Sequence, residues 1–451
     1  MDAKYVFVYG AGISGQGVAE VLAKRGQAVI LYNDEPKELP AALVVNIEKN
    51  GGKCLCKTDV TAYLKNSQTF IISPGIPFSV PLVKQAEALG LEVIAEAEEA
   101  GRLYPGKWVG ITGTNGKTTT TTLIGEMLAT LPVKTATGGN IGAALSKELE
   151  GLGKDSWVAA ELSSFQLEGT SQLKINVALI LNITPDHIER HLTMDNYIAA
   201  KAKIFAAQTK DDVLILNYDD ETVKTFAAKA PGKVCFFSCK KVLAEGAYIE
   251  KGQFVWQWQG KKSVICAVSD MKIFGAHNEQ NALGAIAAAY FAGVSLENIR
   301  KVLKNFQGVE HRLEYVMDIK GVPYYNDSKA TNTDSTIKAL EAFEKGHIIL
   351  LAGGHDKMTP LEEMMELVRT KTDALILLGE ARERFYEAAK KAGVEHIYLV
   401  DSFAAAVNKA YELAKPPQVV LLSPACSSYD MFHDFPERGR VFKELVHKLA
   451  H

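Results

Sequence analysis

A glycine-rich loop at residues 110–118 contains the residue types that bind the phosphate groups of a nucleoside triphosphate. Its sequence is G-I-T-G-T-N-G-K-T, and it follows an apolar run and leads into a threonine-rich helix pattern. The backbone amides of such a loop cradle a β-phosphate, Lys117 would reach the β- and γ-phosphate oxygens, and the Thr118 hydroxyl would bind Mg²⁺. The first glycine, Gly110, stands one position earlier than in the usual G-x-x-x-x-G-K-T spacing. The alternative is a loop with only a structural role, and we favour the phosphate site.

A second glycine-rich loop, at residues 10–15, has the full G-x-G-x-x-G pattern. It follows the apolar run 5–9 and precedes a helix pattern, and Asp34 lies about 20 residues further on. Such glycines permit a tight turn and let a pyrophosphate approach the amides at a helix N-terminus. Dinucleotides and UDP-sugars both contain a pyrophosphate, so the loop predicts a pyrophosphate site without choosing between them. A glycine turn that only packs the helix is the alternative.

Together the two loops narrow the classes of enzyme that this sequence fits. A nicotinamide-dependent dehydrogenase has no use for the loop at 110–118, and a simple kinase has no use for the loop at 10–15. An ATP-driven enzyme whose other substrate is itself a nucleotide would use both loops.

The elements that position these loops alternate along the whole chain. Short apolar runs rich in β-branched residues are followed by helix patterns, which predicts parallel sheets with crossover helices and an α/β fold class. Predicted strands are 5–9, 28–32, 70–72, 107–110, 157–160, 177–181, 213–216, 347–352, 374–378, 396–400 and 419–423, with a further β-rich patch around Trp256 and Trp258. Boundaries near 98 and 308 would give three domains, namely 1–98, 99–308 and 309–451.

The composition is that of an ordinary globular protein, because 47% of the 451 residues are hydrophobic and 23% are charged. Fifty Lys and Arg against 53 Asp and Glu give a net charge of -3, which argues against a nucleic-acid-binding protein. The apolar segment 281–294 is shorter than the ~20 residues of a membrane span and predicts a buried helix, and the N-terminus lacks a signal-peptide pattern. The six cysteines include no C-x-x-C pair and indicate reduced thiols. We therefore expect a cytoplasmic protein without a membrane span. A monomer is also expected, although none of these features indicates the oligomeric state.

The string T-G-T-N-G-K-T at 112–118 resembles the ATP loop of the Mur ligases, enzymes that add amino acids to a UDP-linked peptidoglycan precursor. Further motifs follow in the order of that family and cover all three predicted domains. They are G-N-I-G at 139–142, E-L-S-S-F-Q-L at 161–167, N-I-T-P-D-H at 182–187, Y-x-x-A-K at 197–201, His277-Asn278 with Asn281, and His311-Arg312.

Within the family, N-D-S-K-A-T-N at 326–332 and S-P-A-C-S-S-Y-D at 423–430 are similar to the members that add D-glutamate. The resemblance implies a Rossmann-like UDP-binding N-terminal domain, a central P-loop ATPase-like domain with a parallel sheet, and a Rossmann-like C-terminal domain that binds the amino acid. It also implies an ATP-dependent ligase that adds D-glutamate to UDP-N-acetylmuramoyl-L-alanine through an acyl phosphate and a tetrahedral intermediate. ADP and phosphate would be released, in the cytoplasmic synthesis of peptidoglycan precursors.

The same resemblance implies ATP and two Mg²⁺ ions in the central domain. The catalytic residues would be Lys117, Lys201, His187 and Glu161. Lys201 would carry a carbamate, which replaces an ammonium by an oxygen donor, and the metal ligands would be Thr118, Glu161, His187 and Lys201. The ATP-binding residues would be Gly113, Thr114, Asn115, Gly116, Lys117, Thr118, Thr119, Asn278, Asn281, Arg312 and Asp327.

The resemblance also assigns residues to the two other substrates. The UDP-linked precursor would contact Ile13, Ser14, Gly15, Asp34, Ser73, Pro74, Gly75, Ile76 and Asn140. D-glutamate brings two carboxylates, which need cations and hydroxyl groups. Its residues would be Lys329, Thr331, Lys357, Ser428 and the backbone amide near Phe435. The pair His355-Asp356 before Lys357 departs from the family pattern.

Taken without the resemblance, several of these residues have simpler interpretations. Glu161 could be a solvated charge at a strand end, and His187 a structural histidine, since Mg²⁺ prefers oxygen ligands. A lysine within a helix such as the one predicted at 195–207 is usually exposed to solvent. The match to Y-x-x-A-K selects Lys201 over the nearby Lys203. Asn278 alone could be a helix cap.

Three other functions fit fewer of these motifs. A nicotinamide-dependent oxidoreductase built on residues 10–15 and Asp34 leaves most motifs unexplained. A catalytically silent nucleotide-binding protein would be expected to have lost Lys117, Glu161 or Lys201, and all three are present. A folylpolyglutamate synthetase also adds glutamate, but the UDP-type first domain speaks against it.

Overall fold

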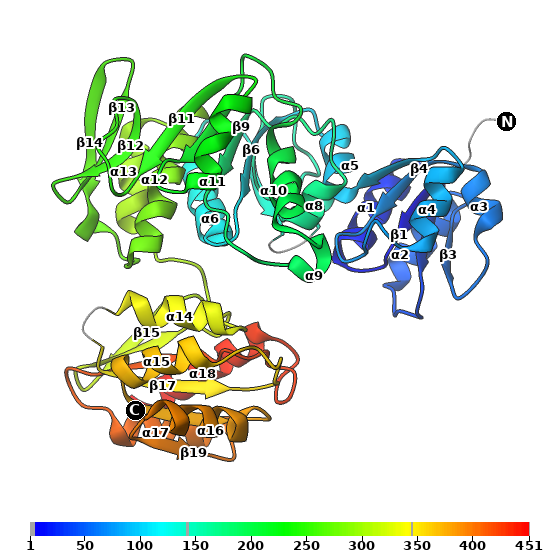
Figure 1. Cartoon of the computed structure of the whole chain (residues 1–451). Helices are drawn as coiled ribbons and strands as arrows, with labels where there is room; N and C mark the ends of the chain where they lie inside the picture. Colours follow the sequence, from blue (N-terminus) through cyan, green and yellow to red (C-terminus); the bar gives the residue numbers. More distant parts are fainter. Residues whose placement is uncertain (1–4, 141–143, 344–345, 451) are drawn as a thin grey trace. The chain divides into compact units, whose positions relative to one another are not determined.

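The computed structural model describes residues 5–140, 144–343 and 346–450. Contacts divide the chain into two compact units, one of Met1–Met271 with His277–Phe306 and the other of Lys272–Ala276 with Gln307–His451. Three separate sheets, of five, nine and six strands, follow one another along the chain (Figure 1). Each sheet has a parallel core with crossover helices, and this confirms the predicted three-domain α/β fold.

The N-terminal sheet has the strand order β3-β2-β1-β4-β5, and all its pairs are parallel. Its order reverses at β1, so the loops after β1 and β4 flank the crevice where α/β sheets bind ligands. The strands are β1 (Tyr5–Tyr9), β2 (Val29–Asn33), β3 (Lys53–Cys56), β4 (Ser67–Ile72) and β5 (Glu92–Ala95). The helices are α1 (Ile13–Lys24), α2 (Ala41–Lys49), α3 (Thr61–Lys65), α4 (Pro81–Ala88) and α5 (Glu96–Leu103).

The central sheet has the order β14-β13-β12-β11-β10-β9-β6-β8-β7, parallel from β12 to β7 and antiparallel among β12, β13 and β14. The strands are β6 (Lys107–Thr112), β7 (Thr135–Gly139), β8 (Trp157–Glu161), β9 (Val177–Ile180), β10 (Val213–Asn217), β11 (Lys233–Ser238), β12 (Gly246–Glu250), β13 (Gln253–Trp258) and β14 (Lys261–Ala267). The α-helices are α6 (Lys117–Leu128), α7 (Leu145–Glu148), α8 (Ser164–Glu168), α9 (Ile188–His191), α10 (Met194–Ala202), α11 (Glu221–Lys224), α12 (Ala276–Phe291) and α13 (Leu296–Asn305). Three 3-10 helices are η1 (Lys203–Phe205), η2 (Thr225–Lys229) and η3 (Val268–Asp270).

The C-terminal sheet has the order β15-β16-β20-β17-β18-β19, with only the pair β15/β16 antiparallel among the described residues. The strands are β15 (Glu314–Ile319), β16 (Val322–Asn326), β17 (Ile348–Gly353), β18 (Thr372–Leu378), β19 (Ile397–Leu399) and β20 (Val419–Leu422). The helices are α14 (Thr333–Ala342), α15 (Glu362–Lys371), α16 (Arg382–Ala392), α17 (Phe403–Leu413) and α18 (Phe435–Leu449).

A short segment from the middle of the chain, Lys272–Ala276, belongs to the second unit. Within it, the ring of Phe274 packs edge to face against Tyr325 at 5.6 Å and against Phe343 at 5.2 Å between centroids. This segment therefore contributes to the hydrophobic core of the second unit although the stretch His277–Phe306 of the first unit follows it in sequence.

Several strands are absent from the sequence prediction, among them β11, β15 and β16, and three others that lie at sheet edges. β3 and β5 are the two edge strands of the N-terminal sheet, and β7 is an edge strand of the central sheet. β3 is half-exposed and β7 contains two glycines, so neither has the apolar run that marks a buried strand. The helix expected at 281–294 is α12, which begins earlier, at Ala276. No helix in the described part of the chain is long and apolar enough to cross a membrane.

Candidate functional site

The loop between β6 and α6 has the shape of a phosphate-binding loop. Gly116, with φ +82°, is the N-cap of α6, so the free amides of the first helical turn face the loop. The Lys117 ammonium folds back over this loop and donates hydrogen bonds to the carbonyl oxygens of Gly113 (2.9 Å) and Thr114 (2.8 Å). Positive charge and free amides therefore meet at one place, which suits an anionic ligand. Thr118 and Thr119 follow as buried residues of this helical turn.

The loop that contains N-I-T-P-D-H is tied to the phosphate loop by several hydrogen bonds, one of them from the Thr114 amide to the Asn182 carbonyl (2.9 Å). The Asn115 amide donates to Asn182 Oδ1 (2.8 Å), and Asn182 Nδ2 donates to the Asn115 carbonyl (3.2 Å). Thr114 Oγ1 donates to the Thr184 carbonyl (3.1 Å) and accepts from the Thr184 amide (3.0 Å). Two motifs almost 70 residues apart are thus held side by side.

Lys201 is buried beside the phosphate loop, contrary to what its helical position alone suggests. Its side chain donates to the Gly113 carbonyl (2.7 Å), and its Nζ lies 4.6 Å from the centre of the Tyr197 ring. Burial, and then the positive charge of Lys117, hold the pKa of Lys201 well below the usual value of a lysine. A neutral amine is the form of lysine that reacts with carbon dioxide.

Glu161, the last residue of β8, is also buried and pairs in the sheet with Ile111 of β6, just before the phosphate loop. Its Oε1 accepts a hydrogen bond from Asn140 Nδ2 (3.1 Å). Its Oε2 is buried and has no hydrogen-bond partner among the residues that the structure describes. A buried carboxylate oxygen without a partner is unfavourable unless a cation or donor binds it, so this oxygen fits a metal ligand. Residues 141 and 142 of the G-N-I-G motif lie outside the described residues.

His187 caps the four-residue helix α9 with a positive φ of 53°. Its half-exposed ring lies 4.8 Å from the ring of Phe165 and within 3.4 Å of an Asp186 oxygen. His191, which the sequence analysis missed, is buried beside it and contacts Ser164 Oγ at 3.0 Å through Nε2. The aromatic rings of 165, 191 and 197 extend from His187 to the Lys201 helix.

Asn281 packs against the phosphate loop from α12. Its Nδ2 donates to Asn278 Oδ1 (3.1 Å), and a Cβ atom added at Gly116 would lie 2.1 Å from Asn281 Oδ1. This contact between residues far apart in sequence explains why the loop needs a glycine at this position, in addition to its positive φ.

Replacing Gly116 by alanine is therefore expected to distort the loop. The substitution causes a steric clash with Asn281 and also strains the backbone, and together these effects should destabilise the fold by about 1–3 kcal/mol. Because the loop is distorted, the KM for ATP should rise at least about tenfold. Thermal unfolding and ATP titrations check both effects. The control is Gly153→Ala, because no atom lies within 4 Å of a Cβ there and the φ is not positive. An unchanged KM for ATP in Gly116→Ala would contradict the prediction.

A cavity of about 400 Å³ lies at the carboxyl ends of β1 and β4. Most predicted UDP-precursor residues line it, together with five residues outside the predicted set, Gly10, Gly12, Asn33, Gly139 and Gln166. The lining comprises Gly10, Gly12, Ile13, Ser14, Asn33, Ser73, Pro74, Gly75, Ile76, Gly139, Asn140 and Gln166.

Two predicted UDP-precursor residues do not line this cavity. Gly15 packs against the chain at Gly10, because an added Cβ would lie 1.8 Å from the Gly10 carbonyl oxygen. Asp34 accepts a hydrogen bond from the Tyr9 hydroxyl (2.5 Å). The position of Gln166 within the E-L-S-S-F-Q-L motif was the available signal for that residue.

In the second unit, Asp327 and Arg312 form a buried polar group at the end of β16. Asp327 accepts hydrogen bonds from the Ser423 hydroxyl (2.8 Å) and the Leu313 amide (3.2 Å). Arg312 Nε is buried and finds no hydrogen-bond partner within the described ranges. Burial raises the pKa of Asp327 to about 7, although the Ser423 bond and the charge of Arg312 act against this rise.

This pKa predicts a pH-dependent stability. The folded chain holds the Asp327 proton up to about pH 7 whereas an unfolded aspartate loses it near pH 4, so Asp327 becomes less favourable to folding as pH rises between them. Over this range its contribution to the free energy of unfolding falls by about 1.4 kcal/mol per pH unit. The unfolding temperature of the wild type minus that of Asp327→Asn should fall from pH 5 to 7 and level off above pH 7. A difference that stays constant, as expected for the exposed control Asp334→Asn, would contradict this.

The predicted D-glutamate residues lie on three loops and one helix start of the second unit. Lys329 and Thr331 follow β16, Lys357 follows β17, Ser428 follows β20, and Phe435 begins α18. The Lys329 ammonium lies 5.8 Å from the centre of the Phe435 ring. The His355 amide donates to the Ser427 carbonyl (3.0 Å), which joins the loops after β17 and β20. Lys357 is exposed and Ser428 is buried.

Three family models match this chain in order. The "Mur ligase MurD-like, N-terminal domain" covers residues 4–95, the "Mur ligase middle domain" covers 111–289, and the "Mur ligase, glutamate ligase domain" covers 311–426. Their boundaries follow the three sheets.

Full-length relatives are named UDP-N-acetylmuramoylalanine–D-glutamate ligase. One from Pelotomaculum thermopropionicum is 41% identical over 443 residues, 98% of this chain and 97% of its own. One from Acidobacterium capsulatum is 40% identical over 458 residues, 100% of this chain and 97% of its own.

Solved structures share the fold at lower identity. UDP-N-acetylmuramate-alanine ligase from Thermotoga maritima has a TM-score of 0.60 and 19% identity over 99% of both chains. A pseudomurein peptide ligase type C from Methanothermus fervidus has a TM-score of 0.58 and 18% identity over 99% of this chain and 100% of its own.

Proposed function

The chain belongs to the Mur ligase family, and we propose that it joins D-glutamate to UDP-N-acetylmuramoyl-L-alanine with release of ADP and phosphate. The observation that carries this proposal is the likeness over the full length to relatives named for that reaction. The reaction would take place in the cytoplasm, in the synthesis of peptidoglycan precursors, and the protein would act as a monomer.

A carboxylate is a poor electrophile, so the reaction begins with its activation. An oxygen of the L-alanine carboxylate attacks the γ-phosphorus of ATP, the bond to the β-γ bridging oxygen breaks, and ADP leaves. The amine of D-glutamate then attacks the carbonyl carbon of the acyl phosphate to form a tetrahedral intermediate. That intermediate expels phosphate, the nitrogen loses a proton, and an amide remains.

The first step brings two anions together, so the chain must supply positive charge. Lys117 and the amides at the start of α6 bind the β- and γ-phosphates of ATP. The buried, unpartnered Glu161 oxygen supports a metal site. Thr118, Glu161, His187 and carbamylated Lys201 would hold two Mg²⁺ ions, which when bound supply positive charge between the phosphate and the carboxylate.

The environment of Lys201 supports the carbamate. A free ammonium buried next to Lys117 would repel cations, whereas a lowered pKa leaves an amine that can add carbon dioxide. Lys201 Nζ already lies at the loop, 2.7 Å from the Gly113 carbonyl, so a carbamate there would stand close to the phosphates.

The remaining residues hold the substrates. The cavity at β1 and β4, with Asn140 at its central-sheet side, accommodates the UDP-linked precursor. Asn278 and Asn281 would contact the adenine region of ATP, Arg312 its phosphates and Asp327 its ribose. Lys329, Thr331, Lys357, Ser428 and the Phe435 amide would bind the two carboxylates of D-glutamate.

The test is phosphate release from ATP and magnesium in the presence of UDP-N-acetylmuramoyl-L-alanine. We expect release with D-glutamate and background release with L-glutamate, L-lysine or no amino acid. Release with another amino acid would keep the chain in the family but assign it a different amino-acid substrate. No release with any amino acid would overturn the proposal.

A further inference from the structure

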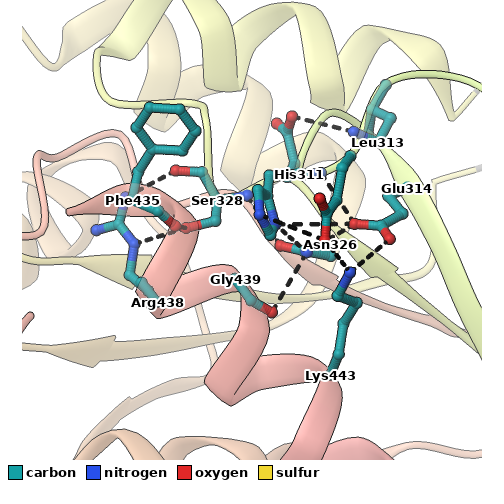
Figure 2. Close-up of polar contacts among 11 residues, drawn as sticks. His311, Leu313, Glu314, Asn326, Ser328, Phe435, Arg438, Gly439 and Lys443 are labelled. Atoms are coloured by element: carbon teal, nitrogen blue, oxygen red, sulfur yellow. Dashed lines mark hydrogen bonds and ion pairs between the residues drawn. The ribbon is translucent and has the colours of Figure 1, made fainter. Parts of the chain in front are cut away.

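Arg438 is a fully buried arginine in the first turns of α18, and its side chain points toward Ser328 (Figure 2). Nε donates to the Ser328 hydroxyl (2.9 Å), and Nη2 donates to the Ser328 carbonyl (2.8 Å). Nη2 also donates to the Cys426 carbonyl (3.1 Å), and Nη1 to the Ser427 carbonyl (3.3 Å). One guanidinium thus binds the loop after β16 and the loop after β20.

The same guanidinium lies beside the third loop. A Cβ atom added at Gly354, which follows β17, would lie 3.2 Å from Arg438 Nη1. Each contact is close in sequence to a residue assigned to D-glutamate. Ser328 precedes Lys329, Ser427 precedes Ser428, Gly354 precedes Lys357 by three residues, and Phe435 precedes Arg438 by three residues on α18.

The start of α18 is itself fixed against the loop after β16. Ser328 Oγ donates to the Phe435 carbonyl (2.8 Å), and Asn326 Nδ2 lies 2.9 Å from His311 Nδ1 (Figure 2). The helix approaches so closely that a Cβ added at Gly439 would lie 2.1 Å from His311 Nδ1. Arg438 therefore extends from a helix whose position is fixed by these contacts, and its side chain has little conformational freedom.

Among the described residues Arg438 forms no ion pair with an Asp or Glu oxygen, and its hydrogen bonds are to carbonyl and hydroxyl oxygens. The nearby charges of Asp430 and Asp327 favour its charged form. Burial lowers its pKa to about 10, so it stays charged at neutral pH. A buried, unpaired charge is costly, and it favours a negatively charged ligand near by.

We propose that Arg438 is a positioning residue for D-glutamate, which holds the three loops of that site in register and places a positive charge behind them. This inference rests on the proposed function. The simpler alternative is a structural tie that contributes to folding alone.

The matched variants are Arg438→Lys and Arg440→Lys, on the same helix. Lysine keeps the charge of Arg438 but loses the planar fork that binds several loops at once. Arg440 is exposed, so its replacement tests the loss of an arginine from α18 without loss of the buried contacts. The readout is steady-state phosphate release, with KM measured separately for D-glutamate, ATP and the UDP-linked precursor.

For Arg438→Lys we expect the KM for D-glutamate to rise about tenfold while the other two KM values change less than about twofold. Arg440→Lys should match the wild type. Equal changes in all three KM values, or a fall in kcat alone, would overturn the proposal in favour of a structural tie.

A milder variant covers the case in which Arg438→Lys does not fold. Ser328→Ala removes one acceptor and leaves the guanidinium in place, and it should raise the KM for D-glutamate selectively, by about threefold. An unchanged KM in that variant would overturn the proposal. Wild-type enzyme without D-glutamate-dependent release would overturn the proposed function as well, whereas an active wild type with unshifted variants overturns this inference alone.

Discussion

Replacing Lys201 by alanine should lower D-glutamate-dependent phosphate release at least about 100-fold, and short-chain carboxylates such as acetate or formate should restore part of it. The side chain is buried beside Gly113, and its depressed pKa leaves an amine ready to become a carbamate. Alanine removes the oxygen donor and opens space at the loop. A small carboxylate that enters this space replaces the lost oxygens.

The control for this prediction is Lys203→Ala, since Lys203 lies two positions further on and is exposed. It should keep wild-type activity and show no response to added carboxylates. A fully active Lys201→Ala would refute the carbamate, and an inactive variant that no carboxylate rescues would weaken it. Detection of the carbamate in wild-type enzyme, by ¹³C NMR under ¹³CO₂, gives a readout independent of activity.

Lys117→Ala should lower phosphate release by about 10³-fold with little loss of stability. In the structure its ammonium donates hydrogen bonds to the carbonyl oxygens of Gly113 and Thr114, and these two bonds are local to the loop. In the reaction, by contrast, no other side chain of the loop carries a positive charge to the β- and γ-phosphates.

Phosphate release and thermal unfolding of the same samples separate the two effects for Lys117. The exposed Lys134→Ala serves as control and should change neither quantity. Retention of more than about a tenth of wild-type activity in Lys117→Ala would show that the helix amides alone position the phosphates.

The parts of the fold that local sequence patterns determine could be predicted from the sequence. Buried parallel strands are continuous apolar runs, and the loops at 10–15 and 110–118 follow such runs, so their places in the α/β fold were predicted correctly. The edge strands β3, β5 and β7 were not predicted, because a half-exposed edge strand needs no continuous apolar run.

The parts of the site that the residues alone do not predict depend on contacts between distant segments, and Lys201 was selected only through the resemblance. Nothing in the residues around Lys201 shows that a helix will bury it against a loop 88 residues earlier. The same holds for Arg438, which pairs with Ser328 across 110 residues, and for Gln166, whose place in the cavity depends on the first sheet. Local patterns identify residue types suited to chemistry, whereas burial and shared contacts come from the tertiary structure.

The contribution of Phe274 to the second unit bears on how this protein can be dissected. A fragment that starts at residue 307 would lack the ring that fills the space between Tyr325 and Phe343, and would expose those two aromatic residues to water. Such a fragment is expected to aggregate during expression. A soluble version for ligand screening would need the segment Lys272–Ala276 joined to it by a linker, or polar replacements at the uncovered rings.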